Sequence, residues 1–235
     1  MLFKKMKSLK VIIILLVLIP LVFPTSSVLA HSYNRNKAAK YAKQYAETKN
    51  PPKWYASPRY NEDCANFASQ ALYYGGWKMN WSHYPRWRTD NGWWHTFYSF
   101  PRASYSWTSA TYLATFSHEK GRATKINLSS FAKAKQLMKK KRMQKGDIVQ
   151  YGKGNNKRHT MIVTSVDARN CKDDVDFKEQ LKNIYGKSHS KYHNDGPICL
   201  SYHTSDKANR SLRAMMLIHK DQDFYLQKVK NTYNK

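Results

Sequence analysis

Apolar residues recur with a helical period near the start of the chain. Five of them lie on one side of a helix drawn from Asn34 to Ala46: Ala38, Tyr41, Ala42, Tyr45 and Ala46. Asn34 is a residue type that caps helices, and the following Asn50-Pro51-Pro52 sequence breaks them. The pattern therefore predicts a first helix over Asn34–Ala46.

A second apolar stripe predicts a helix from Cys64 to Tyr74. Its members follow the spacing i, i+3, i+4, i+7 and i+8: Cys64, Phe67, Ala68, Ala71 and Leu72. Asp63 is expected to cap the amino end, and Gly75-Gly76 to end the helix. Two further helices are predicted, from Trp107 to Glu119 with Ser106 as cap and from Ser130 to Arg142 with Ser129 as cap.

The pattern changes to short strands after Gly146. Four strands are predicted, over residues 148–151, 159–166, 198–204 and 214–218. Residues 168–196 are polar and resemble an insertion between two strands. Helices first and antiparallel strands afterwards predict an α+β domain in which the Cys64 helix packs on the sheet.

The amino terminus has the composition of an export signal. Four lysines (Lys4, Lys5, Lys7 and Lys10) precede the uncharged apolar run Val11–Phe23, and Val28-Leu29-Ala30 supplies small residues for cleavage. The apolar run is short for a membrane span, although an uncleaved anchor stays open. We expect cleavage after Ala30, a mature domain over residues 31–235, and a secreted, wall-associated location.

The charge is strongly positive. The chain has 41 Lys and Arg against 15 Asp and Glu, a formal +26 that becomes +22 without the four signal lysines. For an exported protein this predicts an anionic partner, either a cell-wall polymer or membrane headgroups. No nucleic-acid motif is present, so nucleic acid is not an expected partner. The densest run, Lys133–Lys145, follows helical spacing and is interpreted as a solvated helix face.

Cys64 and His159 are the candidate catalytic residues. A cysteine in the first turn of a helix lies where unpaired amides and the helix dipole favour a thiolate, the nucleophilic form. His159 opens an apolar strand and is available as a base. The alternative is that Cys64 is a small apolar core residue.

Several motifs occur in an order that resembles a known family. They are Asp63-Cys64-x-Asn66-Phe67-x-Ser69-Gln70, Gly146-Asp147-Ile148-Val149-Gln150, His159-Thr160-x-Ile162-Val163-Thr164 and Tyr202-His203-Thr204-x-Asp206. Together they resemble the putative amidase domain of exported bacterial proteins, in the papain-like superfamily of NlpC-type and CHAP cell-wall hydrolases. The resemblance implies a papain-like fold without a cofactor, and cleavage of amide bonds in peptidoglycan stem peptides.

The mechanism that we expect is that of a cysteine hydrolase. In it, His159 takes the proton of Cys64 and later protonates the leaving amine. The end of an antiparallel strand next to His159 carries His203, which we expect to orient its ring, with Asp206 as the alternative. Tyr60 and Asn61 are candidates for an oxyanion hole together with the Cys64 amide. The family often has acidic residues before the histidine, whereas this chain has Asn155-Asn156-Lys157-Arg158, and a neighbouring cation would lower the pKa of His159.

The remaining cysteines leave three alternatives open. Cys171 and Cys199 form a disulfide, stay free, or bind zinc together with His189 and His193. Aromatic residues are abundant between residues 54 and 107, and we expect one or two of four tryptophans to line the substrate cleft: Trp81, Trp87, Trp93 and Trp94.

The sequence therefore predicts an exported cysteine amidase or peptidase. A basic wall- or membrane-binding module on the same fold, with weak or lost catalysis, is the rival interpretation. Transfer of the acyl group to an amine instead of water is a further alternative, because both reactions start from the same thioester.

Overall fold

The computed structural model describes residues 30–48, 63–86, 88–89, 91–96, 102–167, 171, 179, 182–183, 186, 197–203 and 207–233. Several predictions lie outside these residues. They concern the export signal up to residue 29, most of the 168–196 insertion, and the residues Tyr60, Asn61, Trp87, His189, His193 and Asp206.

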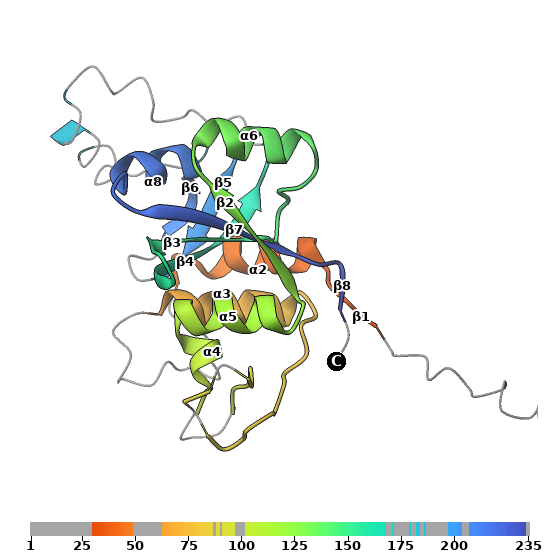
Figure 1. Ribbon diagram of the computed structural model, residues 1–235. Coiled ribbons are helices and arrows are strands. Elements are labelled where there is room, and N and C mark those ends of the chain that lie inside the picture. The colour runs from red at the N-terminus through yellow and green to blue at the C-terminus, as the bar shows by residue number, and fades with distance from the viewer. Residues whose placement is uncertain are drawn as a thin grey trace, which may run out of the picture.

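A six-stranded antiparallel sheet forms the centre of the molecule (Figure 1). The strands follow the order β2 (Ala123–Leu128), β7 (Asp223–Val229), β3 (Ile148–Lys153), β4 (Asn156–Ser165), β5 (Cys199–Tyr202) and β6 (Lys207–Ser211). A separate two-stranded ribbon pairs β1 (His31–Ser32) with β8 (Thr232–Tyr233) and so joins the two ends of the described chain. The predicted α+β class with an antiparallel sheet is confirmed.

Helices cover both faces of this sheet (Figure 1). On one side lie α2 (Arg35–Tyr45), α3 (Cys64–Tyr74) and α5 (Ala110–Glu119), with the short α4 (Tyr105–Thr108) beyond them. On the other side lie α6 (Phe131–Lys139) and α8 (Leu212–Ile218). Each face has its own hydrophobic cluster, so the sheet is buried on both sides.

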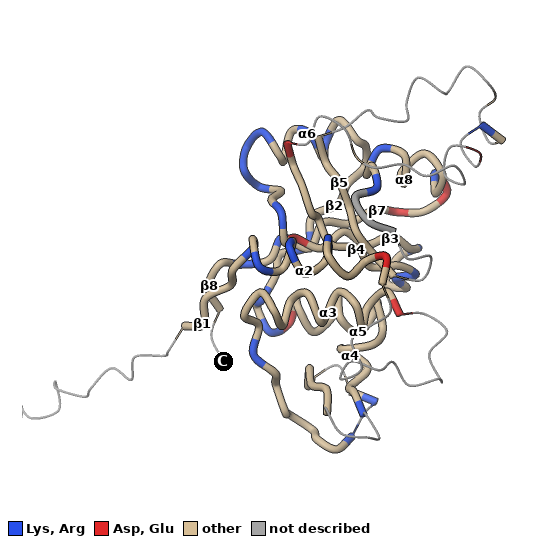
Figure 2. Tube along the Cα trace, turned by 180° about the vertical axis from the view of Figure 1, so that it is seen from behind, with Lys and Arg blue, Asp and Glu red and all other residues tan. Residues whose placement is uncertain are grey.

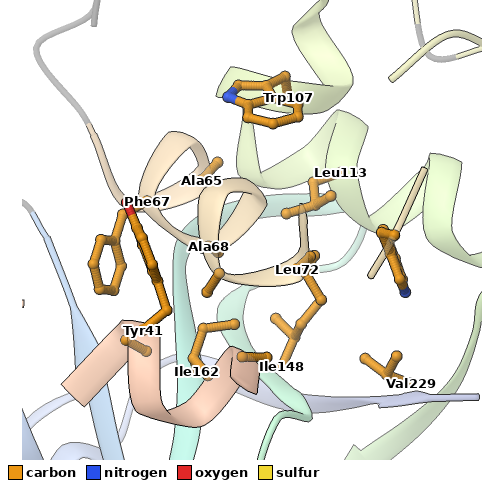
Figure 3. Close-up of a cluster of buried hydrophobic side chains, with 14 of the residues drawn as sticks. Tyr41, Ala65, Phe67, Ala68, Leu72, Trp107, Leu113, Ile148, Ile162 and Val229 are labelled. Carbon is orange, nitrogen blue, oxygen red and sulfur yellow. The ribbon is translucent and has the colours of Figure 1, made fainter. Parts of the chain in front are cut away.

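The α3 helix packs directly on the sheet, as its apolar stripe predicts. Phe67, Ala68 and Leu72 lie in the same cluster as Ile148 of β3 and Ile162 of β4 (Figure 3). Residues 64 to 72 of this helix are all buried, and each fully buried large side chain contributes about 1.5–3 kcal/mol by leaving water. This packing fixes the amino end of α3 against the sheet.

The predicted first helix and its cap are confirmed. Helix α2 starts directly after Asn34, whose side chain accepts from the Lys37 amide at 3.0 Å. The last predicted helix is shorter than expected, and its cap is Ser130 instead of Ser129. The Ser130 hydroxyl accepts from the Lys133 amide at 3.2 Å.

The helix predicted over Trp107–Glu119 is broken in two. Ser109 adopts an extended conformation (φ −112°, ψ 131°) and separates α4 from α5. Ser106 is not a cap: its buried hydroxyl lies 3.1 Å from that of Ser104 and also donates to the Gly92 carbonyl. These contacts hold the turn before α5 against the loop instead of continuing the helix.

The strand predicted over residues 214–218 is wrong, because this segment belongs to α8. Ser211 caps α8 by accepting from the Ala214 amide at 3.4 Å, and a short apolar run does not by itself separate strand from helix. Strands β2 and β7 are absent from the prediction. They pair with each other from Ala123–Val229 to Leu128–Phe224, and their mixture of lysine, glutamine and apolar residues hides the alternation.

A buried ion pair explains the Gly146-Asp147 motif. The Asp147 side chain is fully buried, and its carboxylate accepts from Arg35 at 2.5 Å, from the Gln144 amide at 2.8 Å and from the Val229 amide at 2.9 Å. Gly146 has φ +81°, and a Cβ there would lie 2.9 Å from the Cα of Arg35. This arrangement joins the start, middle and end of the chain.

The described part of the chain contains no helix that is both long and apolar enough to cross a membrane.

Candidate functional site

Cys64 is the first residue of α3. Its thiol is not part of a disulfide, whereas the other two cysteines of the chain are joined to each other. The first amides of a helix lack intrahelical partners and favour a negative charge beside them. Only 2% of Cys64 is exposed, however, and it belongs to the hydrophobic cluster under α3. The position of Cys64 favours a reactive thiolate, whereas its burial is typical of an inert core cysteine.

Asp63 occupies the cap position of α3 but does not cap the backbone. Its carboxylate instead bonds two side chains. One oxygen accepts from the Asn66 amide group at 2.6 Å, and the other lies 2.7 Å from Nδ1 of His203. The expected cap is therefore replaced by an anchor between the α3 helix and the end of β5.

His203 lies directly after β5, on the same side of the sheet as α3. Its ring stacks on Phe67 with a centroid separation of 4.1 Å. Nδ1 faces the Asp63 carboxylate at 2.7 Å, and Nε2 faces the backbone carbonyl of Tyr45 at 2.8 Å. Both partners are acceptors, so both bonds form together when each ring nitrogen carries a proton. The surroundings of His203 therefore favour an imidazolium.

His159 lies on the opposite side of the sheet from α3. Side chains alternate along a strand, and Ile162 belongs to the α3 cluster whereas Met161 and Val163 belong to the other one. His159 has the parity of Met161 and Val163. Its ring contacts Tyr202 at 4.8 Å and Tyr151 at 5.4 Å between centroids.

A bulge in β4 directly precedes His159. Tyr151 pairs with His159 and Gly152 pairs with Lys157, so Arg158 is an extra residue between two paired positions. The bulge alters the side of the residues before His159 relative to those after it, whereas the pairing from His159 to Ile162 is uninterrupted, so plain alternation puts His159 on the side opposite Ile162. The structure thus brings His203, but not His159, to the side of the sheet that carries the Cys64 helix, and the expected contact between the two histidines is not formed.

Burial dominates the protonation of His159. Burial, and to a smaller extent the nearby His219, lower its pKa from 6.5 to about 3. The direction agrees with the expectation from Lys157 and Arg158, but the cause differs. With this pKa, His159 is neutral at pH 7 and is not the partner of an ion pair.

Polar side chains of α3 hold the helix in place. The Trp107 indole donates to Asn66 at 2.7 Å, the Ser69 hydroxyl donates to the Trp107 carbonyl at 2.8 Å, and the Tyr41 hydroxyl donates to Gln70 at 2.6 Å. Asn66 and Gln70 therefore make structural bonds that attach α3 to its neighbours. The polar residues of the motif around Cys64 position the helix in the fold.

Three of the four tryptophans proposed for the cleft lie within the described residues. Trp93 and Trp94 are fully buried, where they pack the interior instead of facing a substrate. Trp81 is 48% exposed and stacks on Trp94 with centroids 5.9 Å apart. Trp81 therefore stays a candidate for substrate contact.

The structure joins Cys171 and Cys199 in a disulfide with their Cα atoms 5.5 Å apart. Cys199 starts β5, the strand that leads to His203. The bridge selects the first of the three alternatives for these cysteines. Among the described residues, no group of histidine, cysteine and acidic side chains is arranged to hold a metal ion.

Sequence reasoning missed the contact between Asp63 and His203. The two residues are 140 positions apart, and Asp63 looks like a helix cap in the sequence. The contact between His203 and the Tyr45 carbonyl was missed as well, because a backbone group leaves no signal in a side-chain pattern. An aspartate directly before the candidate nucleophile was the available clue.

Comparison with known proteins places the chain in a family. The Putative amidase domain family matches residues 32–227, and the chain belongs to this family. The description of the family points to amide hydrolysis. The uncharacterized protein YhbB of Bacillus subtilis (strain 168) is 32% identical over 144 residues, which cover 60% of this chain and 40% of that relative. The chain thus spans less than half the length of this relative, and no solved structure gives a significant match.

Proposed function

We propose that the protein is a cysteine hydrolase that cleaves amide bonds through a thioester on Cys64. The observation that carries the proposal is a cysteine outside any disulfide at the first position of α3, directly after Asp63, which pairs with His203. A thiolate at a helix start and an adjacent imidazolium stabilise each other, which is how cysteine nucleophiles are activated. Membership of an amidase family supports the cleavage of an amide bond.

The reaction has two steps in this proposal. The Cys64 thiolate attacks the carbonyl carbon, the carbon–nitrogen bond breaks, and the leaving amine takes a proton from a histidine. Water then attacks the thioester, releases the acid and returns the proton to the histidine. The helix amide of Cys64 is the candidate donor to the oxyanion.

His203 is our first choice for this histidine, because it lies on the α3 side of the sheet and is held by Asp63. In the described state Nε2 of His203 is bonded to the Tyr45 carbonyl, so the ring must exchange this partner before it can serve the sulfur. His159, the choice that the sequence favours, lies on the other side of the sheet, where its ring contacts Tyr151 and Tyr202.

Peptidoglycan stem peptides are the proposed substrate. Support comes from the predicted export signal, the strong positive charge and the resemblance to cell-wall hydrolases. We propose on the same grounds that the mature protein is secreted and stays with the cell wall. Transfer to an amine and a pure binding role are the alternatives.

Mass spectrometry of purified peptidoglycan incubated with the mature protein tests the proposal. New fragments that differ by hydrolysis of one amide bond, absent with Cys64→Ala, are the expected result. Fragments that carry an added amine, such as glycine, would instead identify acyl transfer. If neither protein produces fragments while both sediment with the wall material, the binding module is the better account.

A further inference from the structure

The side of the molecule where the α2 helix starts and the chain leaves α6 is rich in lysine and arginine (Figure 2). A groove with a volume of about 420 Å³ lies there, between the end of β7, the start of β8 and the turn after α6. Three lysines line it: Lys141, Lys228 and Lys230. We propose that this basic groove binds a linear polymer of phosphodiesters joined through small polyols.

The lysines of the basic groove carry charges that the described part of the protein does not neutralise. No aspartate or glutamate lines the groove, and within the described residues no carboxylate pairs with Lys141, Lys228 or Lys230. Arg35 lines the same groove, but its guanidinium is used by Asp147, Asn231 and the Val229 carbonyl. Three free ammonium groups around one concavity make a site for several anionic groups in succession.

The shape of the groove favours an extended chain. A second cavity, of about 790 Å³, continues from the first and shares Arg35, Lys141 and Asn231 with it. Lys145 and the apolar side chains of Met143 and Val166 line this continuation. Cationic and apolar residues therefore both line the two joined cavities, which suits a polymer whose charged phosphates are separated by uncharged linkers.

A membrane surface fits this region less well. Interfacial proteins combine cations with protruding apolar residues that enter the lipid. Among the described residues, the large exposed hydrophobic side chains are Tyr74, Trp81, Tyr84 and Tyr112, and none of them lines either cavity.

Single-stranded nucleic acid also fits less well. Proteins that bind it place aromatic rings on which the bases stack. No aromatic side chain lines the basic groove, and Tyr33 in the adjoining cavity is 6% exposed and donates its hydroxyl to the Gly146 carbonyl. The groove offers charge without a stacking surface.

The test compares two triple variants of the full mature protein. Lys141→Gln/Lys228→Gln/Lys230→Gln removes the charges of the groove. Lys40→Gln/Lys43→Gln/Lys133→Gln removes the same charge from exposed positions on α2 and α6 that line neither cavity. Affinity for a fluorescent glycerol phosphate oligomer is measured by anisotropy over a range of salt concentrations. Thermal unfolding verifies that both variants fold.

We expect the groove variant to bind at least tenfold more weakly and the control variant to stay within twofold of the original protein. The slope of log affinity against log salt should fall by about two in the groove variant, since each lost phosphate contact removes about 0.7–0.9 from it. Equal losses in both variants would overturn the proposal by showing that charge acts without a defined site.

Two further probes decide the source of the phosphate. Equal or tighter binding of phosphatidylglycerol vesicles through the same lysines would assign the groove to a membrane instead. Equal or tighter binding of a single-stranded DNA oligomer with the same number of phosphates would assign it to nucleic acid. Both assays measure binding and not cleavage, so their outcome is independent of the role proposed for Cys64.

Discussion

His203 has two acceptors, and this determines the chemistry available to it. A ring held between the Asp63 carboxylate and the Tyr45 carbonyl is a donor at both nitrogens. In the proposed mechanism, this imidazolium beside the start of α3 stabilises a thiolate at Cys64. His159 is neutral and lies on the other face of the sheet, so the two histidines should affect the thiol differently.

We therefore expect His203→Gln to slow alkylation of Cys64 at pH 7 by about tenfold or more, because a nearby opposite charge shifts a titration by about one unit or more. His159→Gln, the matched variant, should change the rate by less than about twofold. The measurement is the rate of iodoacetamide labelling, followed by mass spectrometry of the Cys64 peptide. A larger effect of His159→Gln would assign the role of base to His159, as the sequence suggests.

The burial of His159 has a consequence for stability. Its folded pKa of about 3 lies below the ordinary value of 6.5, so the unfolded chain binds a proton first as the pH falls. The free energy of unfolding should then decrease as the pH drops below about 6.5, by up to about 1.4 kcal/mol per unit for this one group.

Urea unfolding of His159→Phe between pH 6.5 and 4 should show a smaller pH dependence than the original protein. His118→Gln, which changes an exposed histidine, is the control and should leave the dependence intact. If the two variants have the same slope, His159 is not buried as the structure places it.

At the scale of single elements, the sequence predicted most clearly where one face is buried. The bounds of α3 agree with the apolar stripe from Cys64 to Leu72, because this helix packs on the sheet along its whole length. The prediction failed at the helix break at Ser109, which the buried hydroxyl contacts of Ser104 and Ser106 decide. It also failed at α8, where seven residues are too few for a clear period.

The same limit explains which parts of the site could be predicted. Cys64 and the candidate histidines could be recognised from their residue types and their places in the sequence pattern. The side of the sheet on which His159 lies depends on the register of β4 against β3, and a shift of one residue leaves the local sequence pattern almost unchanged. The partner of His203 depends on tertiary contact across 140 residues.

The cap of α6 gives a direct test at this scale. Ser130→Ala should lower the free energy of unfolding by about 1 kcal/mol, since the Lys133 amide loses its acceptor. Ser129→Ala, the neighbouring and equally exposed serine, should change it by less than about 0.5 kcal/mol. Urea unfolding measures both, and the reverse order would restore Ser129 as the cap.

At the scale of the whole molecule, Arg35 joins segments that are far apart in the sequence. Its guanidinium pairs with Asp147 on the approach to β3 and donates to the Val229 carbonyl at the end of β7. Removing one partner of a buried pair is costly because the other charge stays in the interior.

Arg35→Gln should therefore lower the free energy of unfolding by about 3–5 kcal/mol at pH 7. Burial already raises the pKa of Asp147 to about 6, and loss of Arg35 removes the main influence that lowers it. A raised pKa favours the folded state at low pH and loses this benefit as the pH rises through it, so the deficit should be smaller at pH 5. Arg142→Gln, an exposed control, should have little effect at either pH.

The whole account depends on whether Cys64 is a functional thiolate or a core residue. The most direct measurement is the rate of Cys64 alkylation in the folded protein as a function of pH. We predict that Cys64 is labelled in the native protein with a midpoint well below about pH 8.5, which is the ordinary pKa of a cysteine thiol. Labelling that occurs only after unfolding would identify Cys64 as a core residue and contradict the proposed mechanism.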